Sequence, residues 1–197
     1  PSEWVEAHFL TAVARGLNLV NFYMFCGGTT RAYHTGRRDI SSYDYDSAIR
    51  ECGGLSEKYY MTRRLGGFLK AFGGLLAETV PSEDIAVDSP RGVAVLHRRG
   101  ESCVFAFPRN LTGTTQDVSC TVDVPGAGVI PADVRLAPRS MKALVFNAPL
   151  HDGLVLLSCT SQITGVYRLE GETILIAAGN PGDRGEEWFP QIGRAHV

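Results

Sequence analysis

The chain has 197 residues, of which 44% are hydrophobic, and its formal net charge is −2. This length fits one or two ordinary domains, and the small charge gives no reason to expect a nucleic acid or an anionic membrane as a partner. No apolar run reaches the length of about 18 residues that a membrane-spanning helix needs. The five cysteines include no C-x-x-C pair. We therefore expect free thiols and neither metal nor cofactor, with a Cys103–Cys120 disulfide as the open alternative.

The N-terminal part of the chain predicts a helix followed by a buried strand. The helix begins with Ser2 as a cap and ends at Gly16. Its apolar stripe consists of Trp4, Val5, His8, Phe9, Ala12 and Val13. On this stripe, a packed and hydrogen-bonded histidine is the favoured interpretation of His8. The near-continuous apolar run over 17–25 is too short for a core helix and predicts a strand buried on both faces. Such a strand needs parallel neighbours and none precedes it, so we expect the chain to begin within a domain.

A polar loop follows this predicted strand and carries groups suited to binding a polyol. Gly27 and Gly28 end the apolar run and let backbone or ligand approach closely. The loop then supplies hydrogen-bonding side chains and the segment SYDYD at 42–46. The hydrogen-bonding side chains that precede SYDYD are Tyr33, His34, Arg37, Arg38 and Asp39. Ser56 opens a second helix to about Leu76, in which two Gly-Gly pairs either mark close packing or end the helix early.

From residue 81 the pattern changes to short alternating runs separated by turn residues. Such a pattern predicts an antiparallel, sandwich-like β domain over 81–191, with a linker at 81–90. The expected strands are 93–97, 103–107, 118–124, 134–136, 143–146, 154–158, 166–169 and 174–177. Asn110-Leu111-Thr112 is a glycosylation acceptor if the protein is secreted by a eukaryote. Residues 192–197 continue no pattern, and we expect them to be a non-native tail.

Three motifs in this order resemble the last strand and loop of the barrel in family 35 glycoside hydrolases, the acid-stable β-galactosidases. They are NFYMFCGGTT at 21–30, SYDYDSAI at 42–49 and LSEKYY at 55–60. Residues from about 93 to 179 are also similar to the β domain that follows the barrel in fungal-type members. The resemblance implies an α/β plus all-β fold. In it, residues 1–80 are the final helix–strand–helix piece of a (β/α)8 TIM barrel, and an antiparallel β-sandwich-like domain follows.

The resemblance also implies a function for the longer protein. It would be a retaining exo-β-galactosidase that hydrolyses terminal β-D-galactosyl residues, with a β-galactoside or oligosaccharide as its partner. The family places its two catalytic glutamates on barrel strands that precede Pro1, so no catalytic residue is assigned and the chain alone is expected to be inactive. Tyr23 and Tyr45 match tyrosines that line the galactose pocket in the family. Tyr43 and Asp44 are expected to brace the loop.

Some residues depart from the family pattern, and two other classes of function stay open. Cys26, Thr30 and Arg31 alter the expected pocket rim, where the aglycone binds. Asp44-Tyr45-Asp46 formally reads D-x-D, the metal–nucleotide clamp of many glycosyltransferases, but nothing else in the chain resembles a nucleotide site. The remaining alternative is a non-catalytic galactoside-binding or structural relative of the same family. The sequence predicts neither the compartment nor the oligomeric state.

Overall fold

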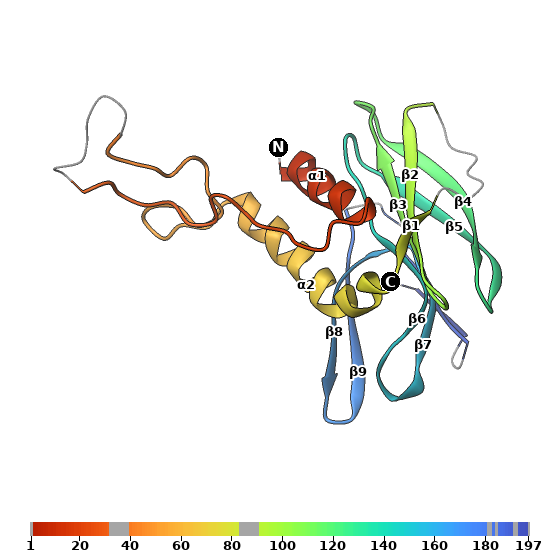
Figure 1. Ribbon diagram of the computed structural model, residues 1–197. Coiled ribbons are helices and arrows are strands. Elements are labelled where there is room, and N and C mark those ends of the chain that lie inside the picture. The colour runs from red at the N-terminus through yellow and green to blue at the C-terminus, as the bar shows by residue number, and fades with distance from the viewer. Residues whose placement is uncertain are drawn as a thin grey trace.

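Over the residues that it describes, the computed structural model contains two α-helices packed on a seven-stranded antiparallel sheet, together with two β-hairpins and an extended arm (Figure 1). The structure describes residues 2–31, 40–82, 91–180, 183, 185–190 and 193–196. Among these residues neither helix combines the length and the apolar character that crossing a membrane requires. The arm consists of residues 17–31 and 40–56. Val20 and Phe22, near its start, pack against the core beneath the helices, and the arm beyond them extends away from the sheet (Figure 1).

Both predicted helices form. Helix α1 spans Ser2–Ala14, and Gly16 follows it with a φ of 95°, a conformation that favours glycine after a helix. Helix α2 spans Glu57–Ala77, with Ser56 in extended conformation at its N-cap. The buried side chains of α2 recur every three or four residues, which is the spacing of one helix face. They are Met61, Leu65, Phe68, Phe72 and Leu76.

The buried face of α1 differs from the stripe predicted for it. Trp4 is 57% exposed and His8 is also exposed, so the expected packing of His8 is wrong. The buried residues are Ala7, Leu10, Val13 and Ala14. Apolar residues lie all round this helix, so the spacing alone could not determine which side meets the sheet.

All the strands predicted after residue 81 form, and the described part of the chain has three more. The seven-stranded sheet has the order β1-β2-β3-β6-β7-β10-β11. Its strands are β1 (Val80–Ser82), β2 (Val93–Arg99), β3 (Val104–Asn110), β6 (Leu144–Pro149), β7 (Val155–Cys159), β10 (Glu186–Phe189) and β11 (Gly193–His196). The hairpins are β4 (Gln116–Val124) with β5 (Gly128–Leu136), and β8 (Gln162–Leu169) with β9 (Glu172–Ala178).

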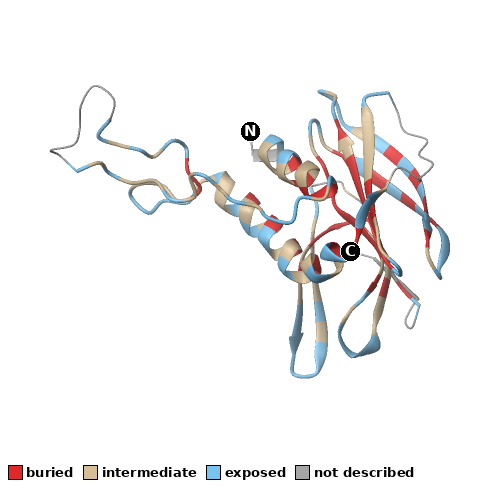
Figure 2. Cartoon of the chain, viewed as in Figure 1, coloured by how far each residue is buried: buried red, intermediate tan, exposed pale blue. Residues whose placement is uncertain are grey.

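Strand β3 lies between the two layers of the core. Phe105 and Phe107 point to the helices, where Phe105 meets Phe68 of α2 edge-on at a ring-centroid distance of 6.3 Å. Val104 and Ala106 point to the other face and pack against the β4–β5 hairpin. Figure 2 shows the buried residues concentrated where these layers meet. The β4–β5 hairpin therefore packs on one face of the sheet to form a β-sandwich, and the two helices cover the other face.

The strand predicted over 17–25 does not form in this structure. Leu19 and Tyr23 are 77% and 91% exposed, and the residues have no ladder partner. A strand buried on both faces needs a neighbouring strand on each side, and the described residues supply none. The helices on either side of this segment in the sequence cover the seven-stranded sheet instead of a barrel wall. The TIM-barrel part of the expectation is thus not confirmed by the fold.

The disulfide alternative is wrong. All five cysteines are free thiols, with Cys103, Cys120 and Cys159 buried. Cys103 belongs to the core layer beneath the helices, whereas Cys120 belongs to the layer beneath the β4–β5 hairpin, so the sheet separates them. Burial also raises the pKa of the Cys120 thiol to about 11, which keeps it protonated and unreactive at neutral pH.

The predicted glycosylation acceptor is a structural residue in this fold. Asn110 is 1% exposed, and its side-chain nitrogen donates hydrogen bonds to the carbonyls of Thr114 at 2.7 Å and Ala137 at 3.0 Å. Its side-chain oxygen accepts from the backbone N–H of Thr112 at 2.8 Å. The nitrogen that would carry a glycan is therefore inaccessible, and the expectation of a surface acceptor does not hold.

One predicted boundary falls within a paired strand, and the predicted tail contains another strand. The division near residue 80 lies in β1, which pairs with β2, and the helices share one core with the sheet. Residues 193–196 form β11, which pairs with β10. The assignment of 1–80 and 81–191 as domains of a longer protein, and of 192–197 as non-native, stays a prediction.

Arg98 of β2 joins both helices to the sheet. Its buried guanidinium donates to the carbonyls of Val13 and Leu76, both at 2.8 Å, and to the carbonyl and hydroxyl of Thr79, both at 2.9 Å. Val13 and Leu76 lie in the last turns of α1 and α2, where carbonyls lack helical partners and the helix dipoles are negative. Burial lowers the pKa of Arg98, but a guanidinium stays charged in proteins.

We expect Arg98→Ala to lower the free energy of unfolding by about 2–4 kcal/mol, because three carbonyls at the helix ends lose a charged donor. Arg99→Ala removes a partly exposed arginine of the same strand, whose ion pair with the exposed Asp123 is a surface interaction, and should change it by less than about 0.5 kcal/mol. Urea unfolding of the three proteins, followed by circular dichroism, measures both values. Equal stability of the two variants would contradict the role given to Arg98.

The Gly-Gly pairs do not end α2, and one glycine allows close packing. A Cβ atom on Gly67 would lie 1.9 Å from the carbonyl oxygen of Thr164 in β8, far inside van der Waals contact. A Cβ atom on Gly66, Gly73 or Gly74 would meet nothing within 4 Å. Helix and hairpin therefore touch backbone to backbone at Gly67.

Adjacent glycines of α2 should respond to alanine in opposite directions. Gly67→Ala should destabilise the protein by more than about 2 kcal/mol, because the new methyl group forces the helix off β8. Gly66→Ala should stabilise it by up to about 1 kcal/mol, because alanine has the higher helix propensity. Thermal unfolding midpoints that shift in the same direction for both variants would show that the helix does not lie on β8 in this way.

Candidate functional site

The arm brings together two of the three motifs that the sequence analysis identifies. One limb contains residues 26–30, from NFYMFCGGTT, and the other contains residues 41–51, which include SYDYD. Backbone hydrogen bonds of 2.8–2.9 Å link them. The N–H of Gly27 donates to the carbonyl of Ile49. The N–H groups of Tyr43 and Thr30 donate to the carbonyls of Gly28 and Ser41, in that order. The limbs form a narrow, ladder-like structure, although only isolated bridges in it qualify as strand pairing.

The two glycines of the first limb allow the second limb to lie this close. A Cβ atom on Gly27 would come within 2.4 Å of the Asp44 carboxylate and 2.9 Å of its Cα atom. A Cβ atom on Gly28 would come within 2.3 Å of the Tyr43 ring. Any side chain at either position would push SYDYD away, which agrees with the backbone role that the sequence predicts for these glycines.

The aspartates of SYDYD are held by cations. Asp44 accepts from Arg50 Nη1 at 2.8 Å and from the backbone N–H of Glu51 at 2.7 Å, and these bonds lower the pKa of its carboxyl. Asp46 pairs with Lys58 Nζ and Arg50 Nη2, both at 2.7 Å, and Lys58 makes the larger contribution to its lowered pKa. We call Asp44, Asp46, Arg50 and Lys58 the Arg50 clasp.

A third carboxylate joins the limbs directly. Glu51 accepts hydrogen bonds from the hydroxyls of Ser42 and Thr29, which lie on opposite limbs. The Ser42 hydroxyl, followed by that of Thr29, holds the pKa of Glu51 below its usual value. Sequence analysis singled out neither Glu51 nor Arg50, because their roles depend on which backbone segments the fold places beside them.

The predicted substrate-binding tyrosines lie on the arm with their rings in solvent. Tyr23 is 91% exposed and Tyr45 is 67% exposed. Tyr23 precedes the first limb, whereas Tyr45 lies at the turn of SYDYD with a φ of 44°. The polar side chains predicted at Tyr33, His34, Arg37, Arg38 and Asp39 lie outside the described residues.

The D-x-D interpretation finds no support in this geometry. A metal–nucleotide clamp needs carboxylate oxygens free to bind the cation. Asp44 and Asp46 instead bind the side chains of Arg50 and Lys58. Within the described part of the chain, no three His, Cys, Asp or Glu residues are grouped so that they could hold a metal ion.

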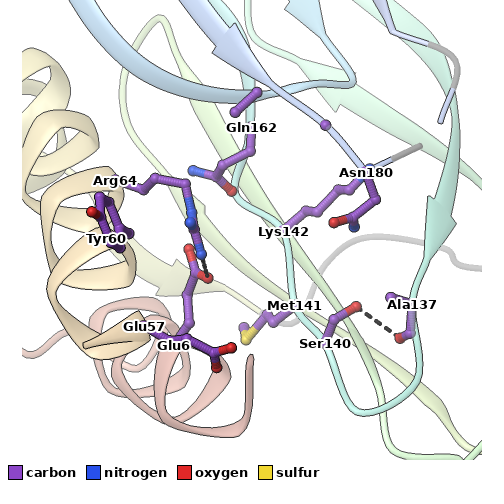
Figure 3. Close-up of a pocket in the computed structure, with 12 residues that line it drawn as sticks. Glu6, Glu57, Tyr60, Arg64, Ala137, Ser140, Met141, Lys142, Gln162 and Asn180 are labelled. Atoms are coloured by element: carbon purple, nitrogen blue, oxygen red, sulfur yellow. Dashed lines mark hydrogen bonds and ion pairs between the residues drawn. The ribbon is translucent and has the colours of Figure 1, made fainter. Parts of the chain in front are cut away.

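A polar cleft of about 410 Å³ lies elsewhere, between the helices and the β region (Figure 3). The helices contribute Glu6, Tyr60 and Arg64, and the β region contributes Lys142 and Gln162. Arg64 pairs with Glu6 at 3.0 Å. Lys142 pairs with Asp183 at 2.8 Å. Neither predicted tyrosine lines the cleft, and its lining residues come from several separate segments of the chain.

Comparison with known proteins bears on the arm and its two helices. Residues 1–69 match the family described as Glycosyl hydrolases family 35. The family 35 resemblance is confirmed. The matched residues include α1, both limbs of the arm and most of α2, so they contain every residue of the Arg50 clasp.

Individual relatives of the family 35 segment are β-galactosidases. The chain is 24% identical to a "Probable beta-galactosidase C" of Penicillium rubens over 196 residues, which are 95% of this chain and 20% of the relative. It is 36% identical to the human "Beta-galactosidase" over 95 residues, 46% of this chain and 13% of the relative. It is 45% identical to that of Mus musculus over 58 residues, 27% of this chain and 9% of the relative. The chain thus spans a fifth or less of the length of these relatives.

The link between the limbs predicts a measurable pKa change. Ser42→Ala removes the stronger donor to Glu51, so the pKa of that carboxyl should rise toward its ordinary value. Carbon-detected NMR titration of the Glu51 side chain measures the change. Ser119→Ala, at an exposed position of β4, is the matched control and should leave the Glu51 titration as it is. Identical Glu51 titrations in the two variants would contradict the contact.

Proposed function

We propose that this chain supplies substrate contacts to a retaining exo-β-galactosidase that hydrolyses terminal β-D-galactosyl residues. The observation that carries the proposal is the family 35 match over residues 1–69, which coincides with the arm and both of its motifs. The names of the relatives from Penicillium rubens and human support the substrate class. The activity is proposed for the full-length enzyme, since the chain corresponds to 20% or less of these relatives.

Tyr23 and Tyr45 are proposed to contact the galactoside. A phenol offers both a hydrogen-bond donor and an acceptor to sugar hydroxyls, and its ring covers apolar C–H groups with little loss of side-chain entropy. The exposure of both rings leaves them accessible to a ligand, which supports this role. Tyr43 is proposed to brace the loop, because its ring packs against Gly28.

The carboxylates of the arm are proposed to be structural and not catalytic. A retaining glycosidase needs a nucleophile and a general acid, with carboxyl groups about 5–5.5 Å apart, and the acid works with a raised pKa. Contacts to Asp44, Asp46 and Glu51 lower the pKa of each carboxyl, which is opposite to what a general acid needs. Both oxygens of each carboxylate also accept from cations, a backbone N–H or hydroxyls, which does not suit a nucleophile. We therefore assign no catalytic residue to this chain and expect the 197-residue chain alone to be inactive.

The test is Tyr45→Phe in the full-length enzyme. Removing one hydrogen bond to the sugar should cost roughly 0.5–3 kcal/mol of transition-state stabilisation on an aryl β-galactoside. This lowers kcat/KM by up to about a hundredfold and leaves folding unchanged. Tyr167→Phe, at a half-exposed tyrosine of β8, is the control and should have no effect.

Unchanged kinetics in both Tyr23→Phe and Tyr45→Phe would contradict the assignment of these tyrosines. A full-length wild type that binds galactosides without hydrolysing them would instead establish the alternative function, a non-catalytic binding relative of the family.

A further inference from the structure

The backbone around Tyr45 has an uncommon conformation. Tyr45 and Asp46 have φ values of 44° and 56°, so two successive non-glycine residues lie in the left-handed region. A side chain disfavours this region, and such residues persist only where their surroundings hold them. The contacts that hold this turn therefore decide how Tyr45 is presented.

One guanidinium holds the residues on both sides of Tyr45. Arg50 Nη1 lies 2.8 Å from a carboxylate oxygen of Asp44, and Arg50 Nη2 lies 2.7 Å from one of Asp46. Lys58 secures Asp46 further, with Nζ 2.7 Å from its carboxylate and 2.8 Å from its backbone carbonyl. The two aspartates flank Tyr45 in the sequence, so Arg50 closes the turn across it.

The Tyr45 side chain has little other support. It is 67% exposed, so packing against protein atoms constrains it weakly, and its direction follows from the left-handed turn. The planar fork of an arginine can bind two carboxylates with fixed geometry, which a single ammonium group on a flexible stem cannot reproduce. We propose that Arg50 is a positioning residue that orients Tyr45 toward the galactoside. This inference rests on the proposed function of Tyr45 as a substrate contact.

The first experiment measures the backbone conformation of the turn in the 197-residue chain. Three-bond HN–Hα couplings of Tyr45 and Asp46 report φ, and NMR measures them in the wild type, Arg50→Ala, Arg50→Lys and Arg63→Ala. Arg63 is an exposed arginine of α2 and serves as the matched control. We expect Arg50→Ala to move both couplings away from their left-handed values, Arg50→Lys to move them partly, and Arg63→Ala to leave them. Unchanged couplings in Arg50→Ala would overturn the inference.

The second experiment measures whether Arg50 acts through Tyr45 in the full-length enzyme. Arg50→Ala should lower kcat/KM on an aryl β-galactoside by about tenfold, because a misplaced contact loses its effect. The loss should largely disappear in the Tyr45→Phe background, because the hydroxyl that Arg50 positions is already absent. Arg50→Lys should recover part of the rate, and Arg63→Ala should keep all of it.

The outcomes separate this inference from the proposed function. If the wild type hydrolyses the galactoside and Arg50→Ala lowers kcat/KM equally in the wild-type and Tyr45→Phe backgrounds, only the positioning role is overturned. A wild type without galactoside hydrolysis would overturn the proposed function and, with it, any role of Tyr45 that depends on substrate.

Discussion

The arrangement of helices on the sheet depends on the buried guanidinium of Arg98. The C-terminal ends of both helices meet at this one group, and its four hydrogen bonds fix where they lie on β2. The arm leaves α1 at its C-terminal end and returns at the N-terminal end of α2. Arg98 therefore holds in place both α1, from which the arm starts, and α2, at which the arm ends. The candidate site contains no residue of β2, yet it depends on this interaction for its attachment.

Much of the β region could be predicted from the sequence, because alternation and turn residues are local signals. The run over 17–25 could not be assigned correctly, since a continuous apolar run records burial on two faces but not the partners that provide it. Val104–Phe107 of β3 has the same kind of pattern, and in the structure β3 is buried on both faces. The roles of Arg98 and Asn110 could not be predicted either, because most of their partners are backbone groups, which have no sequence signature.

The candidate site was predictable in its motifs but not in its contacts. The order and spacing of the motifs identified the two limbs, and the bracing role expected for Asp44 agrees with its bonds to Arg50 and Glu51. Arg50 and Glu51 were missed as functional residues. The i,i+4 spacing of Asp46 and Arg50 is a weak signal of their ion pair, whereas the pairing of Glu51 with Thr29 spans 22 residues and leaves no local trace.

The alternation along β3 also protects the fold against an error in strand register. Its large rings, Phe105 and Phe107, fill the layer beneath the helices, and its smaller side chains, Val104 and Ala106, fill the layer beneath the hairpin. A slip by one residue would exchange these sets, forcing rings into the space sized for a methyl or isopropyl group and leaving voids beneath α2. Because both layers would suffer at once, the misaligned state is penalised twice. In a sheet with one buried face, a register shift disrupts packing against a single core, whereas in β3 it would disrupt packing against two.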